Sequence, residues 1–405
     1  MKKGWEIKKL GAVCDVLNGG TPDTKKKEFW DGNILWITPK DMGKLEMVYV
    51  DDTERKITEA GLKNSSAKIL PVNSVVLSSR APIGHLAINT KPISTNQGCK
   101  GLVPKNDLDT KYLYYFLRNS VQLLNDLGTG TTFKELSGSK LSEVEIPLYP
   151  LPEQRRIVSL LDKCCTTIDK AKANAEQNLI NAKELFDCTL DRILDDKKWK
   201  VKQLGEVCEK VEYGTSSKAK SQGLLPVLRM GNIQNGKFIW DSLVYSDNKE
   251  DNSQYLLKYN DVLFNRTNSL ELVGKTAIFK GERPAIFAGY LIRIHRKENL
   301  LDADYLNYYL NSKKAFEYGK SVVISSVNQA NINGTKLKTY PIPLPPLHDQ
   351  QSIVRQLDAL RDETQKLEAV YQKKIANLEE LKKSVLQKAF SGELRSKNGG
   401  NNDDT

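Results

Sequence analysis

Two sets of polar and basic side chains in loops are the residues of this sequence most able to do chemistry, and the chemistry they fit is recognition of nucleic acid. Side chains that match base edges read sequence: Arg suits guanine, Asn or Gln suits adenine, and Ser or Thr suits either. Lysines and arginines that contact phosphates position a protein without specifying a sequence. The candidates before residue 150 are Asn18, Gly20, Thr21, Lys25, Lys26, Lys27, Lys40, Arg80, Gln97, Thr131 and Lys134. The candidates after residue 197 are Tyr213, Thr215, Ser216, Lys218, Lys220, Arg229, Asn232, Arg266, Asn268, Ser326, Asn328 and Gln329.

The candidates with the strongest base-reading chemistry are Arg80, Arg229, Arg266 and Asn328. Any single candidate has a plainer alternative as a solvated loop residue or a turn former, and Asn18 and Gly20 fit a turn especially well. The charge of the chain supports the set as a whole. Its 61 Lys and Arg outnumber 50 Asp and Glu, which gives a net charge of +11. Basic globular domains indicate a polyanionic partner, with a general excess of surface lysine as the alternative.

The sequence contains no motif that predicts catalysis. Gly274-Lys275-Thr276 and Gly319-Lys320-Ser321 resemble the end of a phosphate-binding loop, but the glycine that should precede each is missing. The Asn/Asp-Pro-Pro-aromatic motif of amino-methyltransferases is also absent. Cys14 and Cys208 follow equivalent Leu-Gly pairs with no histidine at a fixed spacing, which favours packing over nucleophilic chemistry. We therefore expect no catalytic residue and no enzyme activity in the chain itself.

The cysteines and the apolar residues predict a cellular setting. Six cysteines without a CxxC pair, and three histidines away from them, predict no metal site. Free thiols fit a reducing compartment, so we expect a cytoplasmic location. The first residues have no apolar run behind their lysines, and no segment approaches the roughly 20 apolar residues of a membrane span. We expect neither a signal peptide nor a membrane helix.

Two long stretches, Glu153–Leu194 and Asp349–Phe390, must position the globular parts. Each is nearly neutral, lacks Pro and Gly, and follows a proline-rich lead that we expect to be extended. Apolar residues recur at spacings of three and four, which predicts two helices paired along a coiled-coil seam. The expected seam is Ile157, Leu161, Cys164, Ile168, Ala171, Ala175, Ala182 and Leu185 against Ile353, Leu357, Leu360, Leu367, Tyr371, Leu378, Leu381 and Val385. Two ordinary core helices are the alternative.

The chain repeats itself after about 194 residues. Trp5–Cys14 resembles Trp199–Cys208, Tyr112–Leu117 resembles Tyr305–Leu310, and the Ile-Pro-Leu of each lead recurs. Repeats of this kind indicate duplicated structural units. Short strands with one or two helices in each copy predict an α+β fold. We predict five segments: a globular domain at 1–150, a helix at 151–197, a second domain at 198–345, a second helix at 346–392 and a disordered tail at 393–405.

These landmarks together resemble the specificity subunit of type I restriction-modification systems. The family-like positions are Trp5 with Leu10-Gly11, Gly19 with Pro22, Ser79-Arg80 with Gly84, Asn96-Gln97-Gly98, and Leu151-Pro152-Glu153-Gln154 with Ile157. The resemblance covers nearly the whole chain, and the order and recurrence of the landmarks carry it. The second copy departs from the pattern, because Asn268-Ser269 replaces Ala81-Pro82 and no Asn-Gln-Gly follows.

The resemblance implies a non-catalytic DNA-binding subunit with two α+β target-recognition domains in tandem. Each domain would read one half of a split, asymmetric DNA target. The two helices would pair as an antiparallel coiled coil with pseudo-two-fold symmetry, and would act as a spacer and as a platform for two modification subunits. Those partners would bind S-adenosylmethionine and methylate adenine, and a restriction subunit could add cleavage. No cofactor is expected on this chain. A stand-alone nuclease and a coiled-coil adaptor that binds acidic proteins are the alternatives.

Overall fold

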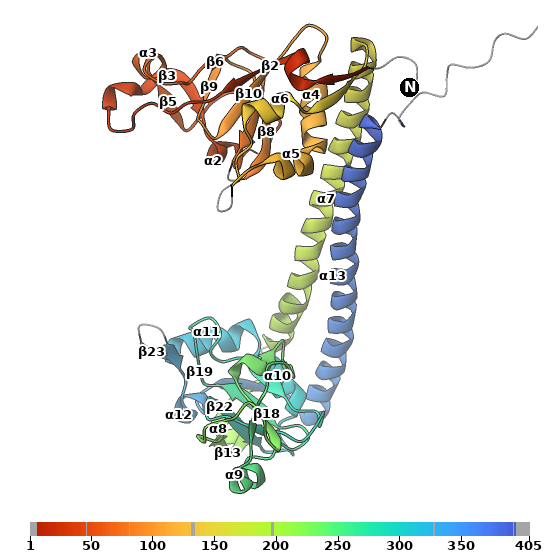
Figure 1. Cartoon of the computed structure of the whole chain (residues 1–405). Helices are drawn as coiled ribbons and strands as arrows, with labels where there is room; N and C mark the ends of the chain where they lie inside the picture. The colour runs from red at the N-terminus through yellow and green to blue at the C-terminus, as the bar shows by residue number, and fades with distance from the viewer. Residues whose placement is uncertain are drawn as a thin grey trace, which may run out of the picture. The chain divides into compact units, whose positions relative to one another are not determined.

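The computed structural model describes residues 6–45, 47–80, 82–130, 134–195, 198–326, 329–391 and 393. The chain divides into two compact units. Unit 1 is Met1–Asn174 with Lys374–Thr405, and unit 2 is Ala175–Lys373. Two 44-residue helices, α7 (Leu151–Leu194) and α13 (Leu347–Phe390), run through both. Each unit therefore holds one α+β domain and about half of each long helix (Figure 1). The tail expected from residue 393 lies outside the described residues except for Glu393.

Unit 1 is built on two sheets, and helix α4 (Thr110–Asn119) packs against the five-stranded one. The five-stranded sheet has the order β2 (Cys14–Asn18), β10 (Cys99–Pro104), β7 (Val75–Ser79), β8 (Ile83–Asn89) and β4 (Tyr49–Val50). The four-stranded sheet has the order β5 (Arg55–Ile57), β3 (Trp30–Ile37), β9 (Ile93–Thr95) and β6 (Ile69–Leu70). Shorter helical segments are α1 (Leu10–Val13), η1 (Lys27–Phe29), α2 (Pro39–Met42), α3 (Glu59–Lys63), α5 (Val121–Leu127) and α6 (Gly138–Ser142).

Unit 2 repeats the central part of this plan. Its four-stranded sheet has the order β13 (Cys208–Tyr213), β22 (Leu291–Arg296), β18 (Val262–Asn265) and β20 (Thr276–Ile278). Smaller sheets join β17 (Val244–Ser246), β14 (Leu225–Leu228) and β21 (Ile286–Phe287), and separately β15 (Ile233–Gln234) and β16 (Lys237–Phe238). A third joins β19 (Thr267–Asn268), β24 (Gln329–Asn331) and β23 (Ile324–Ser326). The helical segments are α8 (Leu204–Val207), η2 (Met230–Asn232), α9 (Lys249–Gln254), α10 (Ala303–Leu310), α11 (Lys313–Val322) and α12 (Gly334–Leu337).

The proline-rich leads are strands, as their extended conformation requires. In unit 1, β11 (Glu145–Leu148) pairs antiparallel with β1 (Glu6–Lys9), and in unit 2, β25 (Pro341–Leu344) pairs in the same way with β12 (Lys200–Gln203). The Tyr112 hydroxyl donates to the Pro147 carbonyl at 2.6 Å, and the Tyr305 hydroxyl donates to the Pro343 carbonyl at 2.8 Å. The aromatic helix of each unit is therefore fixed to the strand that leads into the long helix.

A buried glutamine at the start of each long helix fastens it to the domain before it. The Gln154 side chain accepts from Asp109 N at 2.8 Å and donates to the carbonyls of Asp107 and Tyr149. Gln350 makes the equivalent set with Asp302 N and with the carbonyls of Leu300 and Pro345. Both side chains are fully buried. A buried amide must satisfy its hydrogen bonds, which explains why the acidic-Gln pair recurs.

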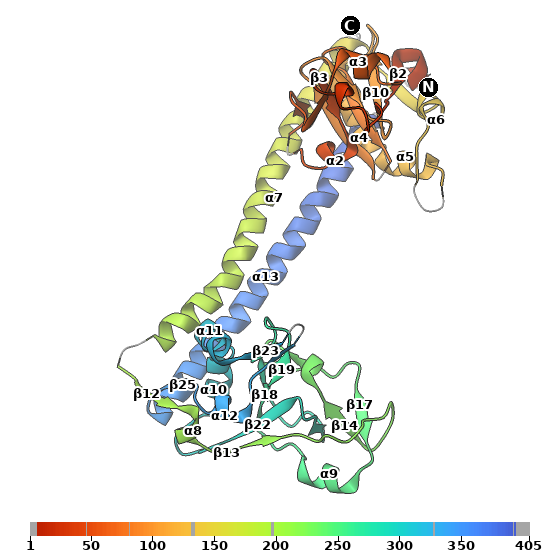
Figure 2. The same ribbon diagram turned by 90° about the vertical axis from the view of Figure 1, so that its left-hand side faces the viewer.

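Within each unit the two long helices run antiparallel (Figures 1 and 2). In unit 1, Lys172 of α7 pairs with Glu379 of α13 at 2.6 Å, and Asp169 pairs with Lys382. In unit 2, the Arg361 guanidinium lies 4.8 Å from the ring centroid of Phe186. The ends of the helices enter the cores of the domains. Phe390 packs on Tyr112 with ring centroids 5.2 Å apart in unit 1, and Leu190 and Leu194 join the core of unit 2.

The predicted seam is correct in part. Its buried residues are Ile157, Leu161, Ile168, Ala175, Ala182, Ile353 and Leu357. Cys164, Leu185, Leu367 and Leu381 are exposed, and the buried residues beside them include Cys165 and Thr364. An α-helix has 3.6 residues per turn, so a strict 3.5-residue spacing misses some positions of the contact face. None of the helices in the described part of the chain is long and apolar enough to cross a membrane.

Candidate nucleic-acid interface

In unit 1, the turn after β2 is pressed against the loop that follows β9. Gly19 N donates to the Cys99 carbonyl at 3.3 Å, and Gly20 N donates to the Thr95 carbonyl at 2.9 Å. The indole of Trp36 donates to the Gly20 carbonyl at 2.9 Å. This contact brings two predicted residues together, because the Thr21 hydroxyl donates to the side-chain oxygen of Gln97. Gly19 and Gly20 are buried, whereas the neighbouring Asn18 and Gln97 are exposed, and we call this turn with its exposed neighbours the edge of unit 1.

Replacing Gly19 by alanine should disrupt this edge. A Cβ at Gly19 would lie 1.9 Å from the Asn96 carbonyl oxygen and 2.5 Å from Thr95 Oγ1. Since overpacking typically costs about 1–3 kcal/mol, we expect Gly19→Ala to lower the unfolding free energy of unit 1 by that amount. Thermal unfolding of the full chain measures it. Gly231→Ala is the matched control, because a Cβ there has nothing within 4 Å. Equal stability of the two variants would contradict the expectation.

Arg80 lies at the same edge, beside two charged residues. Its guanidinium NH1 is 3.8 Å from Glu135 Oε2, and Lys100 Nζ is 4.0 Å from Glu135 Oε1. A Cβ at Gly98 would come 3.1 Å from Arg80 Nε and 3.0 Å from the ring of Pro39, so helix α2 borders the same loop. Arg80 is half-buried and Glu135 is partly exposed, whereas the Lys100 side chain is 7% exposed. Burial lowers the pKa of Lys100, against the opposing effect of Glu135.

The remaining candidates of unit 1 are lysines and one threonine. Lys40 is exposed in α2, and Lys134 is exposed on the loop before Glu135. Lys25, Lys26 and Lys27 are exposed around η1, with the Lys26 ammonium 5.1 Å from the ring centroid of Phe29. Among the described residues no contact joins these three lysines to the Thr21–Gln97 pair. Thr131 lies outside the described residues.

Unit 2 builds the same turn with different side chains. Gly214 N donates to the Leu291 carbonyl at 3.3 Å, and Thr215 N donates to the Phe287 carbonyl at 2.9 Å. The Thr215 hydroxyl donates to Asp251 Oδ2 at 2.5 Å, and the residue is buried. Thr215 therefore organises the turn, while its neighbours Ser216 and Lys218 are exposed. The Lys220 ammonium is also exposed, 3.0 Å from Asp247 Oδ2.

Arg266 is held against Tyr213. Its guanidinium lies 4.9 Å from the centroid of the Tyr213 ring, and its NH1 donates to the Gly289 carbonyl at 3.3 Å. The Tyr213 hydroxyl in turn accepts from Gly334 N at 2.7 Å. Arg266 Nε is buried with no hydrogen-bond partner in the described structure. The stacking and the carbonyl contact hold this arginine in one orientation.

Of the other predicted base readers of unit 2, Asn232 and Asn268 use their side chains in hydrogen bonds within the domain, whereas Arg229 is exposed. Asn232 is buried, where its side chain accepts from Arg229 N at 2.9 Å and donates to the Asp241 carbonyl at 3.0 Å. Arg229 is exposed, with NH2 donating to the Ser242 carbonyl at 3.1 Å. Asn268 lies in β19, where its side-chain oxygen accepts from Ser269 N at 2.9 Å. Ser326 and Gln329 pair between β23 and β24, and Asn328 lies outside the described residues.

The hydrogen bonds show how the two units correspond. Ser79 N donates to the Gly98 carbonyl at 2.8 Å, and Arg266 N donates to the Tyr290 carbonyl at 3.0 Å. Arg266 therefore corresponds to Ser79, and Thr267 corresponds to Arg80. Because successive side chains on an extended chain alternate, the two arginines that the sequence pattern aligns point to different sides. The place of the Asn96–Gly98 loop in unit 2 is taken by residues 288–290.

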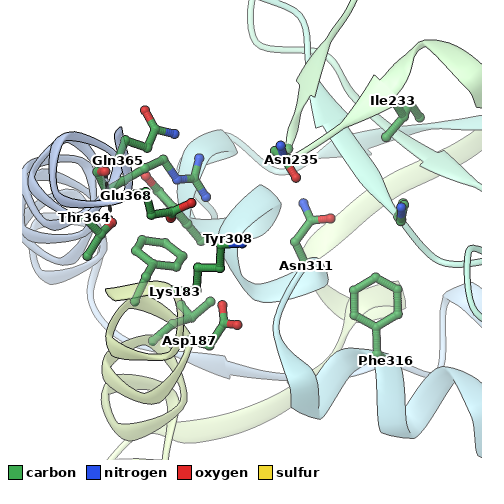
Figure 3. A pocket seen from close by; sticks show the side chains of 15 residues that line it. Lys183, Asp187, Ile233, Asn235, Tyr308, Asn311, Phe316, Thr364, Gln365 and Glu368 are labelled. Carbon is green, nitrogen blue, oxygen red and sulfur yellow. Dashed lines mark hydrogen bonds between the residues drawn. The ribbon is translucent and has the colours of Figure 1, made fainter. Parts of the chain in front are cut away.

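A hollow of ≈ 390 Å³ lies in unit 2 where the long helices meet the domain. Figure 3 shows side chains of α7 and α13 on one side of it and Asn235 and Asn311 on the other. The Arg361 guanidinium lies beside two packed rings here, 4.8 Å from the Phe186 centroid and 4.5 Å from the Tyr308 centroid. The lining also includes Lys183, Asp187 and Glu368. A cation held near aromatic faces stabilises a contact, so this hollow belongs to the attachment of the domain to its helices.

The described residues contain no group of three or more His, Cys, Asp or Glu side chains placed to hold a metal ion. Each unit instead presents exposed amide, hydroxyl, guanidinium or ammonium groups around a hydrogen-bonded turn. The profile of the type I restriction modification DNA specificity domain family matches residues 2–179 and 196–379. The chain belongs to this family.

Relatives in the family resemble the chain to different extents. It is 36% identical over 264 residues to the MjaIX specificity subunit of Methanocaldococcus jannaschii, which covers 59% of this chain and 60% of that relative. It is 36% identical over 165 residues to the EcoR124I/EcoR124II specificity subunit of Escherichia coli, of which 40% is covered. The match to the EcoKI specificity subunit of Escherichia coli is 25% identical but covers 97% of this chain and 90% of that one.

Two solved structures share the fold. The HsdS subunit from Thermoanaerobacter tengcongensis has a TM-score of 0.62 at 20% identity, covering 97% of this chain and 98% of that one. A chain from a structural study of complex assembly and conformational transition in the type I R-M system has a TM-score of 0.75 at 20% identity, covering 97% and 99%. Both confirm the expected tandem α+β architecture with long helices.

Sequence reasoning missed several residues that this specificity-domain chain places at its edge. Lys100 and Glu135 were not among the candidates, although they border Arg80. Lys100 lies within a strand whose neighbours are buried, and nothing in its local sequence marks it. The acidic-Gln pairs that contain Gln154 and Gln350 recur visibly in the sequence. Only the hydrogen bonds of the structure show that these glutamines fasten the long helices to the domains.

Proposed function

We propose that the chain is the DNA-binding specificity subunit of a type I restriction-modification complex and carries no catalytic site of its own. Unit 1 and unit 2 each bind one half of a split, asymmetric target. Arg80, Gln97 and Thr21 act in the first half-site, and Arg229, Arg266 and Asn268 act in the second. The exposed lysines contact phosphates and set the position of each domain on the duplex.

One observation carries this proposal: the two units share a backbone frame but present different side chains on it. Gly19 and Gly214 make equivalent hydrogen bonds, yet the next residue is Gly20 in one unit and Thr215 in the other. Lys100 of unit 1 corresponds to Ile292 of unit 2, because each pairs with the last residue of the first strand of its main sheet. Those last residues are Asn18 and Tyr213, which are both exposed and differ in type. Arg80, whose side chain is 37% exposed, corresponds to Thr267, which is buried. Recognition of the same ligand by both units would not need different side chains. Recognition of two different base sequences does need them.

The partners follow from the same proposal. Two modification subunits would bind the long helices, carry S-adenosylmethionine and methylate adenine, and restriction subunits could join them. The exposed apolar side chains on the helices, among them Leu185 and Leu381, support a protein partner there. The complex would act in the cytoplasm, which is supported by six cysteines that are all free thiols.

Selection from a library of random duplexes tests the proposal. The full chain is used alone and together with modification subunits of its own organism. Bound duplexes should share two different short blocks separated by a gap of constant length. Affinity should fall steeply as salt rises, because phosphate contacts release counterions. Equal retention of all duplexes with the partner present would contradict the proposal.

Two control measurements separate the alternative functions. Incubation of the chain alone with supercoiled plasmid and Mg²⁺ should leave the plasmid intact, whereas nicking would favour a nuclease. A chain that binds a protein partner but no DNA under any salt condition would favour a coiled-coil adaptor.

A further inference from the structure

We infer that unit 1 recognises a G·C base pair through Arg80 and Glu135, and that Lys100 is a positioning residue for the Glu135 carboxylate. The inference rests on the proposed function, since it names the base pair that one of the two half-sites must contain. It also separates Arg80 from Arg266, which the sequence pattern treats as equivalents.

The side chains of Arg80 and Glu135 lie side by side, but they form no hydrogen bond with each other. Their backbones form an antiparallel bridge, and Leu136 N donates to the Ser79 carbonyl at 2.9 Å, so both positions are fixed. The closest atoms of the two side chains are 3.8 Å apart, which is too long for a hydrogen bond. The side chains are 37% and 45% exposed. No hydrogen bond from either side chain to another described residue competes for these groups.

Lys100 lies behind this pair. Its side chain is 7% exposed, and its ammonium lies 4.0 Å from Glu135 Oε1, with the positive charge of Arg80 also acting on it. A buried charge is costly unless it is paired, so Lys100 attracts the carboxylate and restricts where it can lie. The buried ammonium thereby keeps Glu135 beside Arg80 rather than extended into solvent. Lys100 itself is too enclosed to contact a base.

The pair matches the major-groove edge of a G·C base pair. Guanine offers two acceptors there, O6 and N7, and the paired cytosine offers one donor, the N4 amino group. A guanidinium donates to the first and a carboxylate accepts from the second. A phosphate fits less well, because it would bring a second anion against Glu135. An arginine intended for phosphate needs no carboxylate next to it.

Unit 2 lacks charge at all three corresponding positions. Thr267 corresponds to Arg80, Asn331 to Glu135 and Ile292 to Lys100. The Asn331 side chain donates from Nδ2 to Thr267 Oγ1 at 2.8 Å. Ile292 is fully buried and Thr267 is buried. The donor and acceptor pair is therefore a property of unit 1 alone. The preference for G·C at this point should appear in one half-site and not in the other.

The test uses the full chain with its modification partner and the duplex obtained by selection. At one position of one half-site, exchange of G·C for A·T should weaken wild-type binding about 5- to 150-fold, the range of one bidentate base contact. Replacement of that guanine by 7-deazaguanine, which lacks N7, should weaken it as well. Arg80→Ala should reduce both effects to less than about threefold. Lys134→Ala, on the same loop, is the matched control and should weaken binding to all duplexes alike.

Lys100→Met tests the positioning role, because it keeps the apolar stem and removes the charge. Discrimination at the same base pair should fall, while the melting temperature stays the same or rises. Unchanged discrimination would overturn the role of Lys100. A uniform loss of affinity in Arg80→Ala, with discrimination intact, would mean a phosphate contact and would overturn the inference. Absence of any selected sequence from the wild-type chain would instead contradict the proposed function.

Discussion

Replacing Arg293 by methionine should lower the unfolding free energy of unit 2 by about 3–5 kcal/mol, the usual cost of removing one partner from a buried ion network. The Arg293 side chain is 5% exposed. Its Nε and NH2 donate to Glu212 Oε2 at 2.9 and 2.6 Å, and its NH1 donates to Asp261 Oδ2 at 3.0 Å. Methionine would leave Asp261 without its cation and Glu212 with only His295 and Lys210, while both carboxylates stay largely buried.

The corresponding place in unit 1 shows that the fold does not need the charges. Gly101 and Leu17 pair there as Arg293 and Glu212 pair in unit 2, and the side chain of Leu70 fills the space over Gly101. A triple variant, Glu212→Gln with Asp261→Asn and Arg293→Met, should therefore recover at least half of the lost stability. Chemical denaturation of the full chain measures all three species. Lys220→Ala, which breaks an exposed pair with Asp247, is the control and should change stability little.

The same network predicts how the stability of unit 2 depends on pH. Burial by itself would raise the pKa of Glu212, but hydrogen bonds from His295 and Arg293 outweigh it and the pKa is lowered below its ordinary value of 4.5. A carboxyl whose pKa is lowered in the folded state contributes stability above its unfolded pKa. That contribution is lost as pH falls through the folded pKa. The wild type should lose stability below about pH 4.5, and Arg293→Met should lose less over the same interval. Parallel pH profiles would exclude Glu212 as the cause.

Lengthening both long helices by seven residues should lengthen the gap between the two half-sites by about three base pairs. Seven residues add about 10 Å to a helix, and base pairs are stacked about 3.4 Å apart. The insertions belong between Asn174 and Ala175 in α7 and between Lys373 and Lys374 in α13, where the two units divide. A seven-residue insertion turns the contact stripe of each helix by only about 20°.

Binding of the lengthened chain to duplexes with a series of gaps measures this effect. Affinity for the original gap should approach that for unrelated DNA, which specific binding typically exceeds by about 10³-fold or more. The matched control carries the same seven residues as a replacement rather than an insertion. An unchanged optimum gap in the lengthened chain would show that the helices do not set the spacing.

The sequence predicted the architecture because its signals were long or repeated. The helices α7 and α13 needed only continuous stretches of apolar periodicity, and the recurrence of Trp5–Cys14 at Trp199–Cys208 located the second unit. Side-chain positions were harder. Arg80 and Arg266 align in sequence, yet the strand register separates them by one residue, which is enough to change the side of the chain they occupy.

Residues whose role depends on distant partners could not be found in the same way. Lys100 acquires its surroundings from Glu135, 35 positions farther along the chain, and Arg293 acquires its partners from Glu212 and Asp261. Local sequence contains no trace of such pairings. Asn232 shows the reverse case, because its residue type suits adenine while its amide is engaged with Arg229 N and the Asp241 carbonyl.

Phe390 gives the chain an order of assembly. It completes the core of unit 1 by packing on Tyr112 and Phe116, together with Leu386 and Ala389. A ribosome delivers these residues only after all of unit 2, which follows the rest of unit 1 in the sequence. Unit 2, which is a single uninterrupted segment, can mature first. The domain that is synthesised first therefore completes its core last. A premature stop before Lys374 would leave the core of unit 1 incomplete, although unit 2 would be intact.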